Sequence, residues 1–599
     1  MIEIFVFFVI SSFISVFSGR FFLKLSGLDI KKNNISFSEQ GIFGLIFISF
    51  LSLILNFFFK IDQNLASLII LIPFFQLLFE RKVFSKIIIK KFFFHLISIS
   101  LLCAIFIIYD NVNRPDSGIY HLPYTKIIND FKIFFGIVSL NPVFGATSIL
   151  QYTSAIFNNH LFKDVGVTIP LALISIYLIE YFLRQFFKTK ISRVYKFFLL
   201  LIIPYIFLEM NRYSEYGNDN VGHLLLFYLV TLIFREDFNL RLPVYFKLFT
   251  LISLFIFLNK VFLSLTLLLP IVIWFKYKFY LKKKFYPIFS LFFFGIWIIK
   301  NILISGCAIY PIKITCNENL DWYSNNPKFI IAADNLSQFG ELHAKGWSEI
   351  VDEKKFINYE NNLEIKKNFL DKFNWLTSDQ RSQKTSFGFY KLFNNYIFFV
   401  IFLFLFFILY RNAIRQKRGF YFKFEDYLIV SISLLSLFLL IYKFPLGRYG
   451  TSYFVITIFY IFNFLFENKF AILNLNKIKK FFSVLIIVSS CVFVLKNMSR
   501  IILNYGVEYN QSPWPRIYEN SEKLTNVSKN SNLPIKFKNK NKNDILKIYY
   551  VNDLNYWTSS RSSTCMYNRS PCSQTSNIFD NFQIIKTPKN YYMIKLNKN

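Results

Sequence analysis

The sequence predicts an all-α polytopic membrane protein with about 14 transmembrane helices and a small extracytoplasmic C-terminal α/β or β unit. Hydrophobic residues make up 54% of the 599 positions, and they fall into runs of about the length that crosses the hydrocarbon core. The formal charge of +33 lies in short basic clusters between these runs, unlike the basic stripe of a nucleic-acid-binding protein. The chain is therefore expected in a membrane, with no nucleic-acid partner.

The apolar runs are short, and several lie near the lower limit of about 17 residues for a transmembrane helix. The first run has no positive charge before it and no small-residue cleavage site, so it is expected to be retained. A hairpin about Asn259 and Lys260 is expected between Lys247 and Lys276, with one long helix as the alternative. The predicted spans are 2–19, 40–59, 65–79, 92–109, 165–183, 197–210, 221–234, 248–258, 261–275, 287–304, 393–410, 427–442, 451–466 and 481–495.

The loops between these spans form two sets that differ in basic residues. Loops that alternate along the chain must lie on opposite sides of the membrane. The seven loops on one side hold 31 Lys and Arg residues, whereas the four short loops on the other side hold five. The basic set is therefore predicted to be cytoplasmic, and both termini extracytoplasmic. One long helix at 248–275 would break this alternation. The chain then divides into a transmembrane domain, 1–500, with outer loops at 110–164 and 305–392, and an extracytoplasmic C-terminal domain, 501–599.

Four of the six cysteines lie in predicted extracytoplasmic segments. They form two closely spaced pairs, Cys307 with Cys316 and Cys565 with Cys572. An oxidising compartment allows a disulfide in each pair. Neither pair has the Cys-x-x-Cys spacing of a zinc ribbon, and the chain has no His-x-x-x-His motif, so no zinc site is expected.

The loop after the fourth predicted span contains the first candidate site residue, Asp116. A carboxylate at the membrane edge is poorly solvated and is therefore a better proton acceptor than a surface carboxylate. Asp116 is predicted to be a catalytic base. The alternative is that it caps the following helix, and the two roles are compatible. Tyr120 and His121, in the amphipathic stretch that follows, are predicted to bind substrate, with a packed histidine as the alternative for His121.

Three further polar residues stand at predicted outer ends of spans: Asp219, Lys260 and Arg448. Asp219 and the nearby Glu215 could bind a divalent ion or accept hydrogen bonds from hydroxyl groups, or form a solvated turn. Lys260 interrupts an apolar stretch and suits a lipid-linked phosphate, or it extends to the lipid head groups. The planar fork of Arg448 suits a phosphate or pyrophosphate. Together, Lys260 and Arg448 predict a site that holds an anionic lipid.

Several short motifs surround these residues. They are DSGIYHLPYTKIINDFKI from Asp116, NDN around Asp219, NKVFLSL around Lys260, IWIIKNILISGCAIYPI followed by DWY, FPLGRYG around Arg448, and CMYNRSPCS near the C-terminus. Taken together they resemble the GT-C superfamily of membrane glycosyltransferases, and more closely a group of bacterial polytopic membrane proteins with a GT-C-like fold. Lys300 stands where that group usually has Arg.

The resemblance implies a glycosyltransferase in the bacterial cytoplasmic (inner) membrane. Such an enzyme would transfer a sugar from a polyprenyl-phosphate-linked donor to a glycan, lipid or protein acceptor on the outer face. Asp116 matches the acidic base of GT-C enzymes, and Asp219, Lys260 and Arg448 match positions expected in the same cavity. The alternatives are a transporter or flippase of polysaccharide or lipid-linked sugar, and a glycan polymerase or ligase. No cofactor is assigned beyond the divalent ion considered for Asp219, and membrane lipids are the remaining expected partners.

Overall fold

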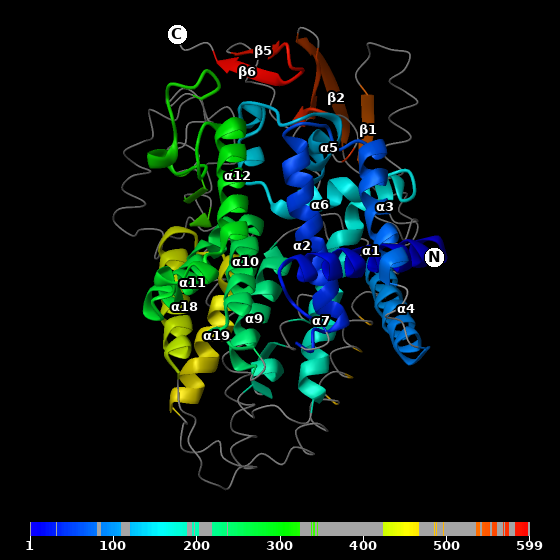
Figure 1. The fold of residues 1–599 in the computed structure, drawn as a ribbon. Coiled ribbons are helices and arrows are strands. Elements are labelled where there is room, and N and C mark those ends of the chain that lie inside the picture. The colour runs from blue at the N-terminus through cyan, green and yellow to red at the C-terminus, as the bar shows by residue number, and fades with distance from the viewer. Residues whose placement is uncertain are drawn as a thin grey trace, which may run out of the picture.

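The computed structural model describes seven continuous segments of the chain: 2–30, 33–80, 86–109, 120–188, 219–235, 238–323 and 423–465. It also describes parts of 195–206, 337–345, 484–495 and 535–596. In these residues helices predominate, and the strands lie together at one end of the molecule (Figure 1). The predicted span 393–410, the catalytic candidate Asp116 and Cys565 lie outside the described residues.

Four helices form the N-terminal part of the bundle: α1 (Ile2–Leu25), α2 (Phe37–Asn56), α3 (Gln63–Glu80) and α4 (Lys86–Tyr109). Helix α2 begins three residues before the predicted span because Ser36 and Glu39 form a capping box at its first turn. Helix α1 continues past Arg20, which the sequence placed in a loop. The Nε of Arg20 donates a hydrogen bond of 2.7 Å to Gln40 on α2.

Glycines bring α1 and α2 almost into backbone contact. A Cβ atom placed on Gly44 would lie 1.7 Å from the carbonyl oxygen of Ser15, and one on Gly19 would lie 1.7 Å from that of Gln40. Both distances are far below van der Waals contact. These two positions therefore set how closely the first two helices pack.

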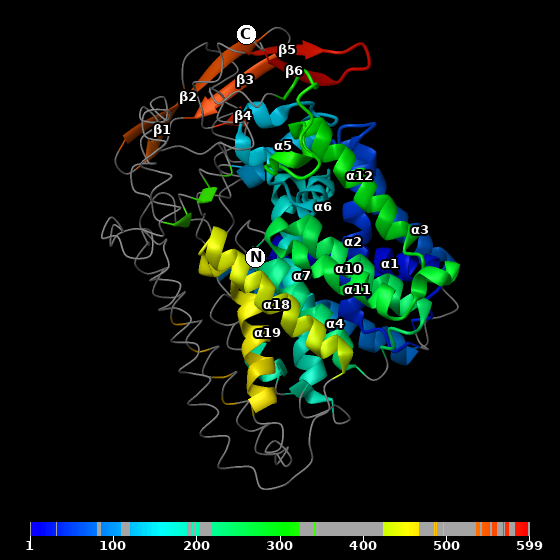
Figure 2. The ribbon, with the colours of Figure 1, turned by 90° about the vertical axis from the view of Figure 1, so that its left-hand side faces the viewer.

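Residues 120–164 of the predicted outer loop contain short, largely buried helices. Helices α5 (Leu122–Asp130) and α6 (Ile149–Phe157) have nine residues each, and α7 (Ile169–Phe187) follows them. Ser148 and Gln151 form a capping box that begins α6. This compact segment lies beside α2 and below the strands in Figures 1 and 2.

The expected hairpin about Asn259 is present. Helix α9 (Asp219–Phe234) is followed by α10 (Pro243–Asn259), which ends where Lys260 adopts an extended conformation. The 3₁₀ helix η7 (Val261–Leu267) then turns back and continues into α11 (Leu268–Lys276). The hydroxyl of Ser253 donates a 2.7 Å hydrogen bond to the carbonyl of Thr266 across the hairpin.

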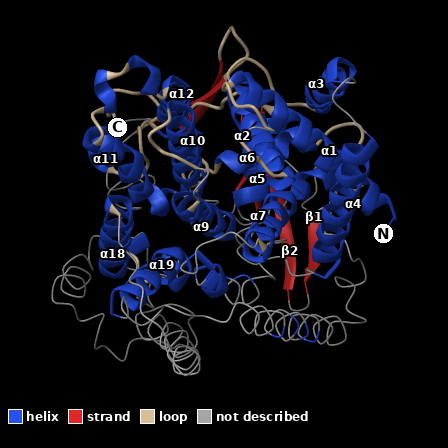
Figure 3. Ribbon diagram, turned by 60° about the horizontal axis from the view of Figure 1, so that its bottom comes forward, coloured by secondary structure: helices blue, strands red, loops and turns tan. Residues whose placement is uncertain are grey.

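The remaining described helices are α12 (Ile288–Ser305), α18 (Phe424–Lys443) and α19 (Gly447–Leu465). Helices α18 and α19 lie together at one side of the bundle, and α3 and α4 lie at the other side (Figure 3). Five described helices are long and apolar enough to cross a membrane, and five further apolar helices have 10–17 residues. The described chain is thus a helical, membrane-like bundle, and the number of about 14 spans stays a prediction.

The described part of the C-terminal unit consists of strands. A four-stranded sheet contains β1 (Ile535–Asn539), β2 (Lys542–Val551), β3 (Leu554–Ser559) and β4 (Cys572–Ser573), and a hairpin contains β5 (Phe582–Lys586) and β6 (Tyr592–Leu596). The backbone of Phe135 pairs with β6 through bonds of 2.9 Å to Tyr592 and 3.0 Å to Ile594. This pairing attaches the hairpin to the segment between α5 and α6.

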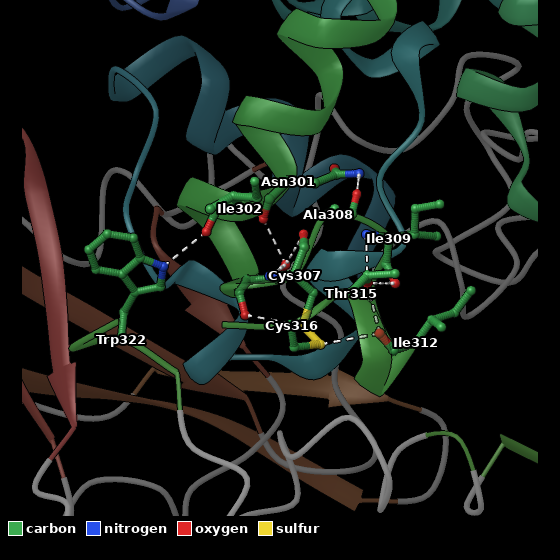
Figure 4. Close-up of a disulfide and its surroundings, with 10 residues drawn as sticks. Asn301, Ile302, Cys307, Ala308, Ile309, Ile312, Thr315, Cys316 and Trp322 are labelled. Atoms are coloured by element: carbon green, nitrogen blue, oxygen red, sulfur yellow. Dashed lines mark hydrogen bonds between the residues drawn. A yellow bond between two sulfur atoms is a disulfide. The ribbon is translucent and has the colours of Figure 1, made fainter. Parts of the chain in front are cut away.

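A disulfide joins Cys307 to Cys316 just after α12 (Figure 4), the first of the two cysteine pairs considered from the sequence. The side-chain amide of Asn301 and the indole of Trp322 donate hydrogen bonds of 3.0 Å to the carbonyls of Ala308 and Ile302. These contacts fold the chain back over the end of α12. Cys572 is also disulfide-bonded.

The contact between α1 and α2 predicts a large difference between two glycine substitutions. Gly44→Ala places a methyl group against the Ser15 carbonyl, so it should destabilise the protein by about 1–3 kcal/mol. Gly295→Ala on α12 meets nothing within 4 Å and should be neutral or slightly stabilising. Thermal unfolding of both variants in one detergent tests this. Equal melting temperatures would contradict the close packing.

Candidate functional site

Three residues singled out from the sequence meet in the structure. Asp219 is the first residue of α9, Lys260 lies between α10 and η7, and Arg448 lies in the first turn of α19. The ammonium of Lys260 contacts one carboxylate oxygen of Asp219 directly. The Nε of Arg448 lies 3.9 Å from the other oxygen. We call these three residues the cationic cluster.

The cationic cluster is partly shielded from solvent. The side chains of Lys260, Asp219 and Arg448 are 19%, 22% and 33% exposed, respectively. Two positive groups and one negative group leave a formal charge of +1. Charges in such a setting are less screened than at an open surface, so this net positive charge would favour a nearby anion.

His223 fixes the position of the Arg448 segment against α9. It lies one helical turn after Asp219, so both residues share one face of the helix. Its Nδ1 lies 2.7 Å from the hydroxyl of Ser452, and its Nε2 lies 2.7 Å from the carbonyl oxygen of Arg448. The first turn of α19 is therefore held beside the carboxylate. Sequence reasoning did not find this contact, because nothing in the sequence indicates which distant segment faces His223.

Aromatic rings support the two cations. The rings of Phe262 and Tyr449 stack with centroids 4.0 Å apart and planes 15° apart. The ammonium of Lys260 lies 5.5 Å from the Tyr449 centroid, and the guanidinium carbon of Arg448 lies 5.0 Å from it. Cations over aromatic faces gain electrostatic stabilisation. Tyr449 thus contributes to the orientation of both cations.

His121 lies within the electrostatic field of the cluster. It is 3% exposed and precedes α5, outside the membrane-spanning segments. Burial, followed by the charge of Lys260, lowers the pKa of His121 to about 3; Asp219 acts in the opposite direction. The ring is neutral at physiological pH, so it can donate one hydrogen bond and accept another. The side-chain nitrogen of Gln151 lies 3.4 Å from its Nδ1.

Tyr120 lies beside His121, with ring centroids 4.1 Å apart. The residues that the sequence predicted as substrate-binding are therefore distributed over two neighbouring groups: the cationic cluster, and the Tyr120–His121 pair. The role of Asp116 stays a prediction, because that residue lies outside the described part of the chain. The same holds for a divalent ion between Asp219 and Glu215, since Glu215 is also outside it.

Buried polar residues behind the cluster were not selected from the sequence. The hydroxyl of Ser148 donates a 2.7 Å hydrogen bond to Asn259, next to Lys260. The Nζ of Lys300 donates a 2.6 Å bond to the hydroxyl of Thr147 and lies 3.4 Å from the centroid of the Trp297 ring. Lys300 could have been selected from the sequence, since it is the lysine within the apolar run IWIIKNILIS. Ionisable residues at membrane depth are rare without a partner. These bonds connect the start of α6 with α10 and α12.

A protein-family model described as "Domain of unknown function (DUF8201)" matches residues 1–455. The chain belongs to this family. The DUF8201 region contains Asp219, Lys260 and Arg448 and ends within α19, whereas the strands of the C-terminal unit lie beyond it. No curated protein and no solved structure matches the chain.

The cationic cluster predicts energetic coupling between Asp219 and Lys260. Because the pair is partly buried, a double-mutant cycle with Asp219→Asn and Lys260→Met should give a coupling of about 1–3 kcal/mol. The pair Lys60–Asp62, at 3.3 Å with side chains 57% and 32% exposed, serves as the control and should give less than about 1 kcal/mol. Unfolding in one detergent provides both values. Equal coupling in the two pairs would contradict the special environment of the cluster.

The environment of His121 predicts a pH effect on stability. Its pKa is about 3 in the folded chain and 6.5 ordinarily, so between these values the unfolded chain binds a proton that the folded chain does not. The free energy of unfolding should therefore fall as pH decreases below about 6.5, by about 1.4 kcal/mol per pH unit. Above about pH 6.5 His121 is neutral in both the folded and the unfolded chain, so it adds no pH dependence to the free energy of unfolding. His121→Gln should lose less stability between neutral pH and about pH 5 than the unchanged protein.

The control for this pH comparison is His160→Gln, which removes an exposed histidine hydrogen-bonded to Asn64. Melting temperatures across the pH series provide the measurement. If His121→Gln and His160→Gln follow the same curve as the unchanged protein, His121 is not the group responsible.

Proposed function

We propose that this DUF8201 protein is an integral membrane glycosyltransferase of the GT-C type. It transfers a sugar from a polyprenyl-phosphate-linked donor to a glycan, lipid or protein acceptor. The meeting of Lys260 and Arg448 around Asp219 supports this proposal most strongly, because it provides a partly desolvated positive site at the ends of apolar helices. A lipid phosphate needs both a positive contact for its charge and an apolar surface for its chain.

The proposed reaction exchanges one bond at the sugar for another. The acceptor hydroxyl oxygen forms a bond to the anomeric carbon, and the bond from that carbon to the lipid-phosphate oxygen breaks. Negative charge grows on the departing phosphate, and Lys260 and Arg448 stabilise it through charge-assisted hydrogen bonds. Asp219 keeps Lys260 charged and oriented. The proton of the acceptor hydroxyl passes to Asp116, the base proposed from the sequence.

The Tyr120–His121 pair has a supporting role in this proposal. A neutral imidazole and a phenol can hydrogen-bond to sugar hydroxyls without adding charge to the site. Asp116 stands four residues before Tyr120 in the sequence. The proposed base therefore precedes this pair closely in the sequence, and His121 lies in the field of Lys260.

The proposed location is the bacterial cytoplasmic membrane, with both termini and the β unit on the extracytoplasmic side. The difference of 31 against five basic residues between the two sets of loops supports this orientation. The disulfide between Cys307 and Cys316 is in keeping with it, because stable disulfides form in oxidising compartments.

The proposal predicts which substitutions abolish sugar transfer. Lys260→Gln removes one stabilising charge and should lower the rate at least about 100-fold. Asp116→Asn removes the proposed base and should lower it by about 100-fold to 10,000-fold. Lys247→Gln, at the opposite end of α10 from Lys260, should be unaffected. The measurement is transfer of radiolabelled sugar in membranes that contain equal amounts of each protein.

Two results would count against the enzyme. Full transfer by both Lys260→Gln and Asp116→Asn would contradict the assigned roles. Movement of a lipid-linked sugar across liposomes that contain the purified protein and no acceptor, without any transfer when an acceptor is added, would indicate a carrier instead.

A further inference from the structure

A cleft lies away from the cationic cluster, on the side of the molecule where the strands gather. It has a volume of about 410 Å³ and lies between the α2–α3 turn, the C-terminal end of α5 and the turn of the β5–β6 hairpin. Phe59, Asp62, Asp130, Phe131, Asn590 and Tyr592 are among its lining residues. These segments are far apart in sequence and meet at the upper end of the bundle in Figure 1.

Two lysines and two carboxylates line this cleft, Lys60 and Lys132 with Asp62 and Asp130. Asp62 lies 3.3 Å from the ammonium of Lys60, and Asp130 lies 3.1 Å from that of Lys126. Burial raises the pKa of Asp130, and the charges of Lys126 and then Lys60 oppose that effect. The ammonium of Lys132 donates a 3.2 Å hydrogen bond to the carbonyl of Lys589 in the hairpin turn. The cleft is therefore polar without a strong excess of either charge.

Aromatic side chains form the apolar part of the same cleft. The rings of Phe131 and Tyr592 meet edge to face, with centroids 5.3 Å apart and planes at 88°. Phe59 is 55% exposed. Aromatic surfaces beside a few fixed carboxylate and amide groups fit a ligand that has both CH faces and hydroxyl groups. A sugar chain has this chemistry.

Helix α5 connects the cleft to the cationic cluster. His121 precedes its first residue and Asp130 is its last, and nine helical residues span about 13 Å. A single sugar could not occupy both places, whereas a chain of sugars could. The hairpin residues Asn590 and Tyr592 lie beyond the DUF8201 match, which ends at residue 455. One wall of the cleft thus comes from outside the region shared with the family.

We propose that this cleft binds a neutral glycan chain, as the site for the part of the acceptor remote from the reacting hydroxyl. Its role as an acceptor site rests on the proposed glycosyltransferase activity, whereas glycan binding itself does not. The compensated charges favour hydroxyl-rich neutral chains over uronate-containing ones. The β5–β6 hairpin then determines which glycans the protein accepts.

The test uses the full-length protein in nanodiscs and an array of neutral oligosaccharides, uronate-containing oligosaccharides and monosaccharides. We expect binding of at least one neutral oligosaccharide, with monosaccharides weaker by about tenfold or more. Asp130→Asn and Asn590→Gly should each weaken that binding about tenfold, the usual effect of losing one polar contact. Asn590 has a φ of +59°, so Gly keeps this backbone and removes only the side chain.

Lys595→Ala is the matched control. Lys595 is an exposed residue of β6 that points to the opposite face of the strand from Tyr592, Ile594 and Leu596. This variant should bind neutral glycans as the unchanged protein does. Binding should also persist in Lys260→Gln, which impairs the proposed transfer but does not touch the cleft.

The outcomes separate the two proposals. If no neutral oligosaccharide binds, or if Asp130→Asn and Asn590→Gly bind as well as Lys595→Ala, the glycan assignment is wrong, whatever the transfer assay gives. Preferential binding of uronate-containing chains would also overturn it. If binding follows the expected pattern but no sugar is transferred, the glycan site stands and the glycosyltransferase proposal fails.

Discussion

The contact between Lys260 and Asp219 holds three element ends together: the start of α9, the end of α10 and the start of η7. Lys260 interrupts a long apolar stretch, and without a counter-charge its ammonium would be costly there. Asp219 supplies the counter-charge from the start of α9. Gly222, one turn later on α9, lets the helices approach: a Cβ on it would lie 2.8 Å from Leu263 and 3.2 Å from the side-chain nitrogen of Asn259. The ion pair and this close approach together fix the hairpin against α9.

Other segments attach to this centre through hydrogen bonds. His223 holds the first turn of α19, and Asn259 receives the hydroxyl of Ser148 from the start of α6. Further outward, the hydroxyl of Tyr567 donates a 2.5 Å bond to Asn129 on α5 and accepts a 2.6 Å bond from Asn158. The C-terminal unit is thus bonded to the C-terminal ends of α5 and α6, at the opposite end of α5 from His121. Both proposed sites share this small group of short helices.

The family match covers one of the two proposed sites completely and the other only in part. The cationic cluster lies within the DUF8201 region, and the hairpin wall of the cleft proposed to bind glycans lies outside it. A phosphate-binding centre needs the same few charged groups for any lipid-phosphate donor. An acceptor site, in contrast, must differ wherever the acceptor differs, because specificity depends on contacts to the distinguishing groups. A cleft built partly from a peripheral hairpin provides this freedom.

The sequence alone predicted a helical, membrane-like chain and the hairpin about Asn259. Apolar runs must be helical in a membrane because their backbone groups have no water to bond, and the predicted break at Asn259 and Lys260 is a real turn. It also selected Asp219, Lys260 and Arg448. Only the tertiary structure decided that these three meet, that His223 and Ser452 position Arg448, and that β6 pairs with Phe135. Periodicity specifies which face of a helix is buried, but not which distant segment covers it, because that choice depends on packing across the whole bundle.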